Sequence, residues 1–162
     1  MTAQSITPAP VRKTVRVNAN AARAFDVFAN NINRWWPSSH TILKAPLKET
    51  VIEPFVKGRW YQIGEDGSQC DTGHVMAWEP PHRLLLAWQI NADWQFDPNL
   101  ITEVEVKFIA EGERTTRVEL EHRHLERMGA KADVARASVD SPNGWGAILE
   151  AYRQVAEAGR GT

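Results

Sequence analysis

The stretch SPNGWGAILEAYRQVAEAG, residues 141–159, carries the clearest helical pattern in the chain. Its apolar residues recur at spacings of three and four, at Trp145, Ile148, Leu149, Tyr152, Val155 and Ala156. This spacing places them on one face of a helix, so the segment must cover a larger apolar surface. Ser141 and Pro142 suit the N-cap and the first helical position, and Gly159 is expected to end the helix.

The middle of the chain, from Leu47 to Leu125, predicts the surface that this helix covers. Helical periodicity is absent there, and short apolar segments alternate with turn signals such as Pro80-Pro81 and Glu111-Gly112-Glu113. Six strands are expected, over residues 49–53, 58–63, 70–78, 83–90, 101–110 and 115–125. Because short turns join successive strands, they should form an antiparallel meander.

The N-terminal part of the chain adds a strand and a helix. Residues 12–17 alternate between polar and apolar, with Val15 and Val17 on one face. Apolar residues then recur every three or four positions from Ala21 to Trp35, which predicts an amphipathic helix that Pro37 ends. Together the patterns predict an α+β fold, in which a single curved, seven-stranded antiparallel sheet packs against a long C-terminal helix.

Length and composition favour one globular domain. We expect residues 1–10 to be a disordered lead-in and residues 11–159 to be the folded, ligand-binding domain. The net charge of −1 gives no electrostatic reason to expect nucleic-acid binding. No apolar stretch is long enough for a membrane span and the N-terminus lacks a secretory pattern, so a cytoplasmic location is predicted.

Seven tryptophans in 162 residues suggest either a thick core or an aromatic-lined cavity. Trp60 and Trp88 fall on expected strands and Trp94 in a loop that could cover a cavity between the sheet and the last helix. A pocket wall is one interpretation of these three residues, and core packing is the alternative. For Trp35 and Trp145, core packing is favoured.

Two polar residues complete the predicted ligand-binding set of Trp60, Trp88, Trp94, His122 and Glu53. His122 shares a strand face with Val118 and Leu120, so it should point inward and could orient a ligand. Glu53 shares a face with apolar neighbours, and it either anchors a ligand or pairs with Arg59. His40, after Trp-Trp-Pro, is expected in a loop near the pocket mouth.

No catalytic residue, metal or cofactor is predicted. Cys70 and His74 share a strand face, but the meander places them three strands from His122, about 14 Å away. Nothing in the sequence would lower the pKa of the Cys70 thiol, and adjacent Asp71 would oppose such a shift. The chain also lacks a glycine-rich nucleotide loop and a Gly-x-Ser-x-Gly nucleophile turn.

Beyond these patterns, the chain resembles the START/Bet v 1-like (SRPBCC) superfamily, and within it the family of the activator of Hsp90 ATPase. The resemblance is carried by Ala24–Phe28, Arg34–Pro37, Glu53-Pro54, Gly58–Trp60, Gly73–Val75, Trp78–Leu84, Thr116–His122 and Gly144-Trp145. It spans nearly the whole chain after the first ten residues. It implies a helix-grip fold whose cavity lies between the curved sheet and the C-terminal helix.

For function, the resemblance implies less, because this scaffold hosts unrelated activities. The first hypothesis is a non-enzymatic domain that holds a hydrophobic or aromatic small molecule. One alternative is an enzyme of the polyketide cyclase/aromatase type. Another is a module that interacts with a chaperone or other protein partner.

Overall fold

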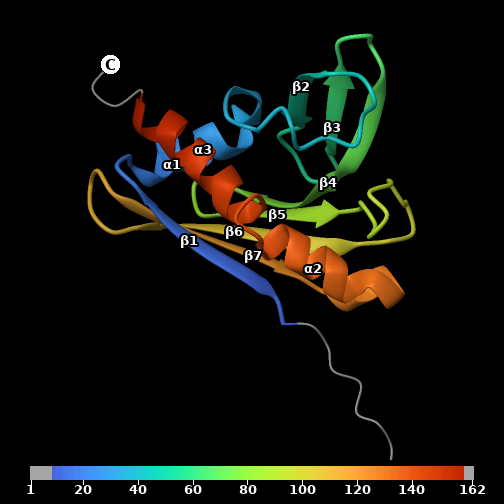
Figure 1. The fold of residues 1–162 in the computed structure, drawn as a ribbon. Helices are drawn as coiled ribbons and strands as arrows, with labels where there is room; N and C mark the ends of the chain where they lie inside the picture. Colours follow the sequence, from blue (N-terminus) through green and yellow to red (C-terminus); the bar gives the residue numbers. More distant parts are fainter. Residues whose placement is uncertain (1–8, 159–162) are drawn as a thin grey trace, which may run out of the picture.

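A single antiparallel sheet of seven strands organises the protein, which a computed structural model describes over residues 9–158 (Figure 1). The order across the sheet is β1-β7-β6-β5-β4-β3-β2. The strands are β1 (Val11–Val17), β2 (Leu47–Ile52), β3 (Arg59–Gly64), β4 (Gln69–Glu79), β5 (Arg83–Trp88), β6 (Thr102–Ala110) and β7 (Thr116–Arg123). The predicted meander is thus confirmed. The expected lead-in, apart from Ala9 and Pro10, and the expected helix end at Gly159 lie outside the described residues.

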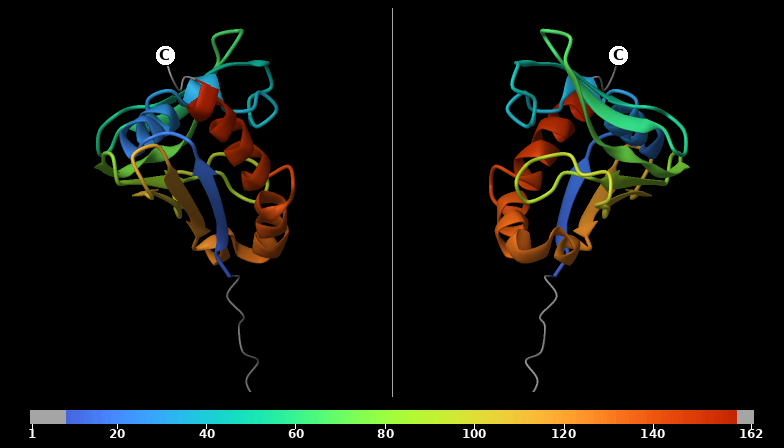
Figure 2. Two further views of the ribbon diagram at one scale, coloured as in Figure 1. Left: turned by 90° about the vertical axis from the view of Figure 1, so that its left-hand side faces the viewer. Right: turned by 90° about the vertical axis from the view of Figure 1, so that its right-hand side faces the viewer.

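The helices lie on the inner side of the curved sheet, and Figure 2 shows α3 crossing it obliquely. They are α1 (Ala21–Ala29), α2 (Ala132–Asp140) and α3 (Trp145–Ala158), with 3-10 turns η1 (Ile32–Arg34) and η2 (Leu125–Lys131). The Tyr152 hydroxyl donates a 2.8 Å hydrogen bond to the Ala24 carbonyl, which ties α3 to α1. This is the α+β helix-grip arrangement that the sequence predicts.

The first helix is shorter than its apolar stripe suggests. The Asp26 carbonyl accepts hydrogen bonds from the backbone N–H groups of both Asn30 and Asn31, at 2.9 and 3.1 Å. The Asp26 carboxylate also accepts from both asparagine side chains. These bonds stop α1 at Ala29, and the stripe continues through η1 to Trp35. The expected single helix is therefore two pieces.

The last helix begins three residues later than predicted. The Ser141 hydroxyl donates to the Ser138 carbonyl at 2.6 Å, so it ends α2 instead of capping α3. The chain then turns tightly, with a 2.8 Å bond from the Gly144 N–H to the Ser141 carbonyl. A Cβ at Gly144 would lie 2.2 Å from the Val139 carbonyl oxygen, so only glycine fits this junction. α3 therefore starts at Trp145.

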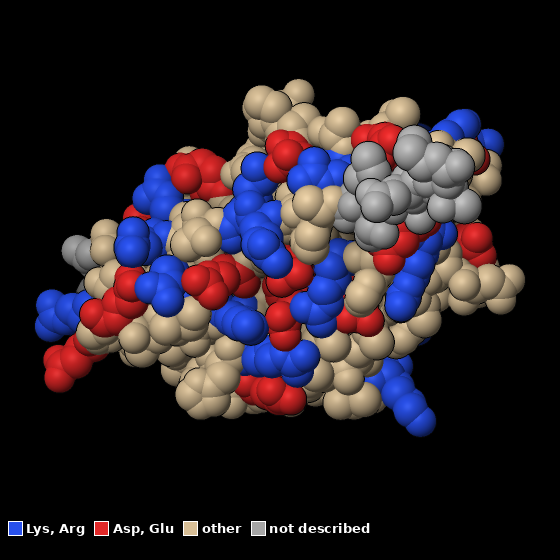
Figure 3. Space-filling view, turned by 90° about the horizontal axis from the view of Figure 1, so that it is seen from below, with Lys and Arg blue, Asp and Glu red and all other residues tan. Residues whose placement is uncertain are grey.

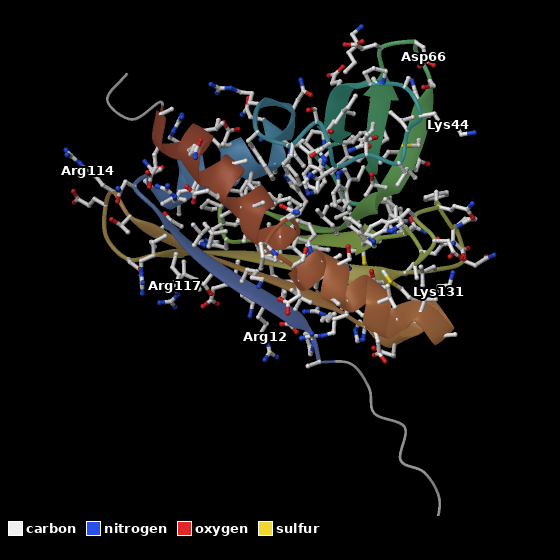
Figure 4. All side chains as sticks on the ribbon, viewed as in Figure 1. Arg12, Lys44, Asp66, Arg114, Arg117 and Lys131 are labelled. Carbon is white, nitrogen blue, oxygen red and sulfur yellow. The ribbon has the colours of Figure 1, made fainter. Side chains whose placement is uncertain are left out.

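The outer face of the sheet is covered by interleaved charges (Figure 3). Glu105 on β6 lies at its centre, 2.6 Å from Arg83 and 3.0 Å from Arg123. Partial burial opposes ionisation of Glu105, but the hydrogen bonds from both arginines lower its pKa. Arg12 and Arg117, labelled in Figure 4, also project from this face. The outer face is polar, so apolar side chains gather on the inner face.

The β4–β5 pairing depends on a glycine. A Cβ at Gly73 would lie 1.7 Å from the Ala87 carbonyl oxygen, whereas one at Gly146 on α3 would meet open space. We expect Gly73→Ala to lower the free energy of unfolding by about 3 kcal/mol through overpacking. The matched control Gly146→Ala should raise it by about 0.5–1 kcal/mol, because alanine favours a helix. Urea unfolding followed by circular dichroism measures both, and equal effects would contradict the account.

Candidate functional site

A cavity of about 710 Å³ lies between the inner face of the sheet and α3. Its wall combines residues from β3, β4, β5, α2, α3 and three connecting loops. The residues that line it are Trp36, Ser39, His40, Thr41, Ile42, Gln62, Thr72, Trp88, Ile90, Trp94, Ser138, Val139, Ser141, Asn143, Gly144, Trp145 and Ile148. None of them is Lys, Arg, Asp or Glu, and only His40 has an ionisable side chain. The cavity is therefore aromatic and close to neutral.

Four indole rings form a closed cycle at one side of this cavity. Trp36 packs edge-on against Trp60, Trp60 against Trp88, Trp88 against Trp145, and Trp145 against Trp36. The ring centroids are 5.9, 5.6, 5.8 and 6.1 Å apart, within the range for favourable edge-to-face pairs. We call these four residues the tryptophan cycle. Each ring restrains two others, so the cycle forms a rigid wall.

Three N–H groups of the tryptophan cycle are engaged by the protein. Trp36 Nε1 donates to the His40 carbonyl at 2.8 Å and Trp88 Nε1 to the Ile90 carbonyl at 3.1 Å. Trp145 Nε1 donates to His122 Nδ1 at 3.2 Å. Because these polar edges already have partners, the three lining rings offer the cavity mainly their apolar surface. The Trp60 Nε1 atom is the only buried side-chain nitrogen or oxygen without a hydrogen-bond partner among residues 9–158.

His122 on β7 lies behind this wall and is completely buried. The Trp145 indole can only donate, so His122 Nδ1 accepts and the ring proton resides on Nε2. Nε2 lies 2.9 Å from the Thr102 hydroxyl, which in turn donates to the Trp88 carbonyl at 3.1 Å. Burial lowers the pKa of His122 from 6.5 to about 3. The neutral imidazole thus holds Trp145 and the β5–β6 pair in place.

The predicted ligand-binding residues separate into three groups. Trp88 and Trp94 line the cavity. Trp60 and His122 point inward but lie one layer behind it, each against the Trp88 ring. Glu53 is not among the lining residues; its carboxylate accepts a 2.6 Å hydrogen bond from the Arg59 backbone N–H.

The expected Glu53–Arg59 ion pair is replaced by another contact. The Arg59 guanidinium lies 2.7 Å from Asp71 on β4. Glu53 instead caps the chain reversal before β3, where Gly58 packs so closely that a Cβ would lie 2.7 Å from the Glu53 carbonyl oxygen. Glu53 therefore shapes a turn.

Two contacts hold the loops at the cavity mouth. His40 Nε2 donates to the Asn143 carbonyl at 2.6 Å, linking the loop before β2 to the turn before α3. Asp93 pairs with Lys131 at 2.6 Å, linking the β5–β6 loop to η2. Trp94, in that loop, is 48% exposed and has a φ of 60°. Trp94 thus stands on a loop held by an ion pair, in a position to cover the mouth of the cavity.

Sequence patterns alone did not identify several of the residues that line the cavity. Trp145 lies on the apolar stripe of the last helix and Trp36 directly follows that of the first, and core packing would explain both equally well. Gln62 and Thr72 lie in strands without an apolar alternation that singles them out, yet they are only 3% exposed. Gly73, next to Thr72, was the one available signal, since glycine within a strand often marks a bulge.

Cys70 and His74 on β4 are not among the residues that line the cavity. Burial and the nearby Asp71 carboxylate raise the pKa of the Cys70 thiol, so it is a poor nucleophile. His74 Nδ1 lies 2.9 Å from the Gln89 side-chain oxygen. Among residues 9–158, no group of three or more His, Cys, Asp or Glu could hold a metal ion. No helix within that range is long and apolar enough to cross a membrane.

A curved antiparallel sheet, a C-terminal helix across it and a cavity between them define the helix-grip class of α+β domains. The chain belongs to the activator of Hsp90 ATPase homolog 1-like family, whose pattern it matches over residues 18–157. The family resemblance seen in the sequence is thus confirmed.

Two solved structures are similar over nearly their full lengths. One is an anthrahydroquino-γ-pyrone synthase, Txn09, at 37% identity and a TM-score of 0.65, with 92% of this chain and 97% of that protein covered. The other is CalC from Micromonospora echinospora, described as a self-sacrificing resistance protein. It is 31% identical, with a TM-score of 0.68 and coverage of 94% and 97%. No curated protein matches the chain.

The burial of His122 predicts a loss of stability in acid. The unfolded chain binds a proton at this histidine below about pH 6.5, whereas the folded protein resists until about pH 3. The free energy of unfolding should therefore fall as the pH falls through this window. We expect the contribution of His122 to decrease by about 2 kcal/mol between pH 7 and pH 5. His122→Gln, which keeps a donor and an acceptor but does not titrate, should lose that part of the pH dependence in urea unfolding.

Exposed His82 supplies the control for this experiment. His82→Gln makes the same substitution at an exposed position and should leave the free energy of unfolding at pH 7 close to that of the wild type. If His122→Gln has the same pH dependence of unfolding as the wild type, His122 takes up a proton as readily in the folded protein as in the unfolded chain. That result would contradict the lowered pKa of His122.

Proposed function

We propose that the protein binds a neutral, planar aromatic molecule of more than one ring in the cavity between the sheet and α3. The observation that carries this proposal is a 710 Å³ cavity walled by Trp36, Trp88, Trp94 and Trp145 without one Lys, Arg, Asp or Glu. Cavities of a few hundred to a thousand Å³ with mostly apolar walls are typical of small-molecule sites.

The chemistry of the wall supports a neutral aromatic ligand. A charged ligand would lose its hydration and find no opposite charge within the lining, which is costly. A flat aromatic ligand would instead make stacked or edge-on contacts with the indole rings, worth about 0.5–1.5 kcal/mol per ring pair beyond burial. A rigid wall adds to affinity, because little freedom is lost when the ligand enters.

The name of one relative supports this class of ligand. The name of the 37%-identical protein, an anthrahydroquino-γ-pyrone synthase, describes a fused aromatic system. For the present chain, we propose only the shared ligand class: a fused-ring molecule of low polarity. A cytoplasmic location, predicted from the sequence, completes the proposal.

Binding without catalysis is favoured over an enzyme of the cyclase/aromatase type. His122, a histidine whose pKa burial lowers strongly, is sealed behind Trp88 and Trp145 and does not reach the cavity. The lining carries only one candidate acid/base, His40, and both its nitrogens have partners: the Asn143 carbonyl and the Ser39 hydroxyl. The alternative of an enzyme rests on His40 and on the similarity of the chain to the anthrahydroquino-γ-pyrone synthase.

A protein-interaction module is the less favoured alternative. Such a module should expose a broad apolar patch. Among residues 9–158, the exposed large apolar side chains are Phe55, Val56, Trp94 and Val134. Phe55 and Val56 are neighbours in one turn, whereas Trp94 lies at the cavity mouth and Val134 on α2. This distribution favours the cavity as the binding site.

Xanthone, a neutral three-ring ketone, is a suitable probe for this proposal. Titrated into the protein, it should quench tryptophan fluorescence saturably, with a dissociation constant in the micromolar range. Ile148→Phe fills the cavity from α3 and should weaken the binding at least tenfold. Val134→Phe adds the same side chain at a 69% exposed position and should leave it unchanged.

Two results would contradict the proposal. One is linear, non-saturating quenching of the wild-type protein. The other is equal affinity in the two phenylalanine variants, with both folded by circular dichroism, because xanthone would then bind outside the cavity.

A further inference from the structure

Thr72 on β4 is the one deeply buried polar side chain of the cavity wall without a protein partner. The residue is 3% exposed and lines the cavity. Within residues 9–158, its hydroxyl forms no hydrogen bond, and it is not among the polar atoms sealed from solvent. It is therefore open to the cavity and free to bond with whatever fills it.

A bulge in the sheet turns Thr72 inward. Trp60 on β3 pairs with Gly73, but the next β3 residue, Tyr61, pairs with Asp71, so Thr72 is an extra residue on β4. Thr72 and Gly73 are both buried, which breaks the alternation of the strand. Bulges of this kind re-aim side chains near functional sites. The close packing of Gly73 against Ala87 fixes the position of the bulge.

The other well-buried polar side chain of the lining is already satisfied. The Gln62 oxygen accepts from the Thr41 hydroxyl at 2.6 Å, and its nitrogen donates to the His40 carbonyl at 3.1 Å. At the rim, the Ser141 hydroxyl donates to the Ser138 carbonyl. The Thr72 hydroxyl faces the cavity without a protein partner, so a ligand that displaces water from it must offer a hydrogen-bonding atom or leave the hydroxyl unpaired. A ligand oxygen beside Thr72 would supply that atom.

We propose that the Thr72 hydroxyl donates a hydrogen bond to a carbonyl oxygen at the edge of the aromatic ligand, so that the cavity selects ring ketones over the corresponding hydrocarbons. This inference rests on the proposed function and narrows its ligand class. Gly73, which follows Thr72, pairs with Trp88 across the strands, so a ring against the Trp88 face has its edge near β4. Apolar contacts then supply affinity, and Thr72 supplies orientation.

The test compares xanthone with xanthene, which has the same three-ring frame with a methylene group in place of the carbonyl. Wild-type protein should bind xanthone about fivefold more tightly than xanthene, as expected for one neutral hydrogen bond. Thr72→Val removes the hydroxyl but keeps the branched shape, and it should abolish the preference by weakening xanthone binding while xanthene binding stays or improves. Thr72→Ser keeps the hydroxyl and should retain the preference.

The outcomes separate this inference from the proposed function. Thermal denaturation first checks that Thr72→Val is folded. If both compounds bind in the cavity and this variant keeps the wild-type preference for xanthone, the proposed role of Thr72 is wrong. The proposal of an aromatic binding cavity is then unaffected. If the wild-type protein binds neither compound, the proposed function is overturned and the role of Thr72 with it. If Thr72→Val loses the preference for xanthone over xanthene and Thr72→Ser retains it, the result supports both the proposed function and the role of Thr72.

Discussion

The edge-to-face packing of the tryptophan cycle is the interaction on which the site depends. Trp36 comes from the segment after α1, Trp60 from β3, Trp88 from β5 and Trp145 from the start of α3. Four parts of the chain that are distant in sequence therefore meet in one cluster, with ring centroids 5.6 to 6.1 Å apart. The cycle joins the sheet to the C-terminal helix and also forms the cavity wall, so the same contacts serve folding and binding.

Buried polar groups keep the cycle in register. His122 Nδ1 accepts a hydrogen bond from the Trp145 indole, and its Nε2–H donates one to the Thr102 hydroxyl. That hydroxyl donates in turn to the Trp88 carbonyl, which fixes the neighbouring strand. This is a fully satisfied chain inside an apolar core, the condition under which buried polar groups specify one arrangement. The histidine that the sequence offered as a ligand contact therefore supports the wall from behind, and its lowered pKa reflects burial.

The architecture could be predicted because each element has a local cause. Alternation in β7 places Val118, Leu120 and His122 on the buried face, and the stripe of α3 predicts its contact with the sheet. The details of the site could not be predicted in this way. The inward turn of Thr72 comes from a bulge set by strand pairing, and the start of α3 from the close packing of Gly144. Both depend on segments that are distant in sequence.

The most direct test of an aromatic binding cavity is a ¹H–¹⁵N spectrum of the seven indole N–H groups, recorded during titration with xanthone. Trp35 contacts Trp36 but does not itself line the cavity, and its indole N–H donates to the Val27 carbonyl, so it serves as an internal reference. If xanthone binds in the cavity, we expect saturable shifts for Trp36, Trp88, Trp94 and Trp145 and little change for Trp35. Shifts confined to the exposed Trp94, or no shifts at all, would contradict binding in the cavity.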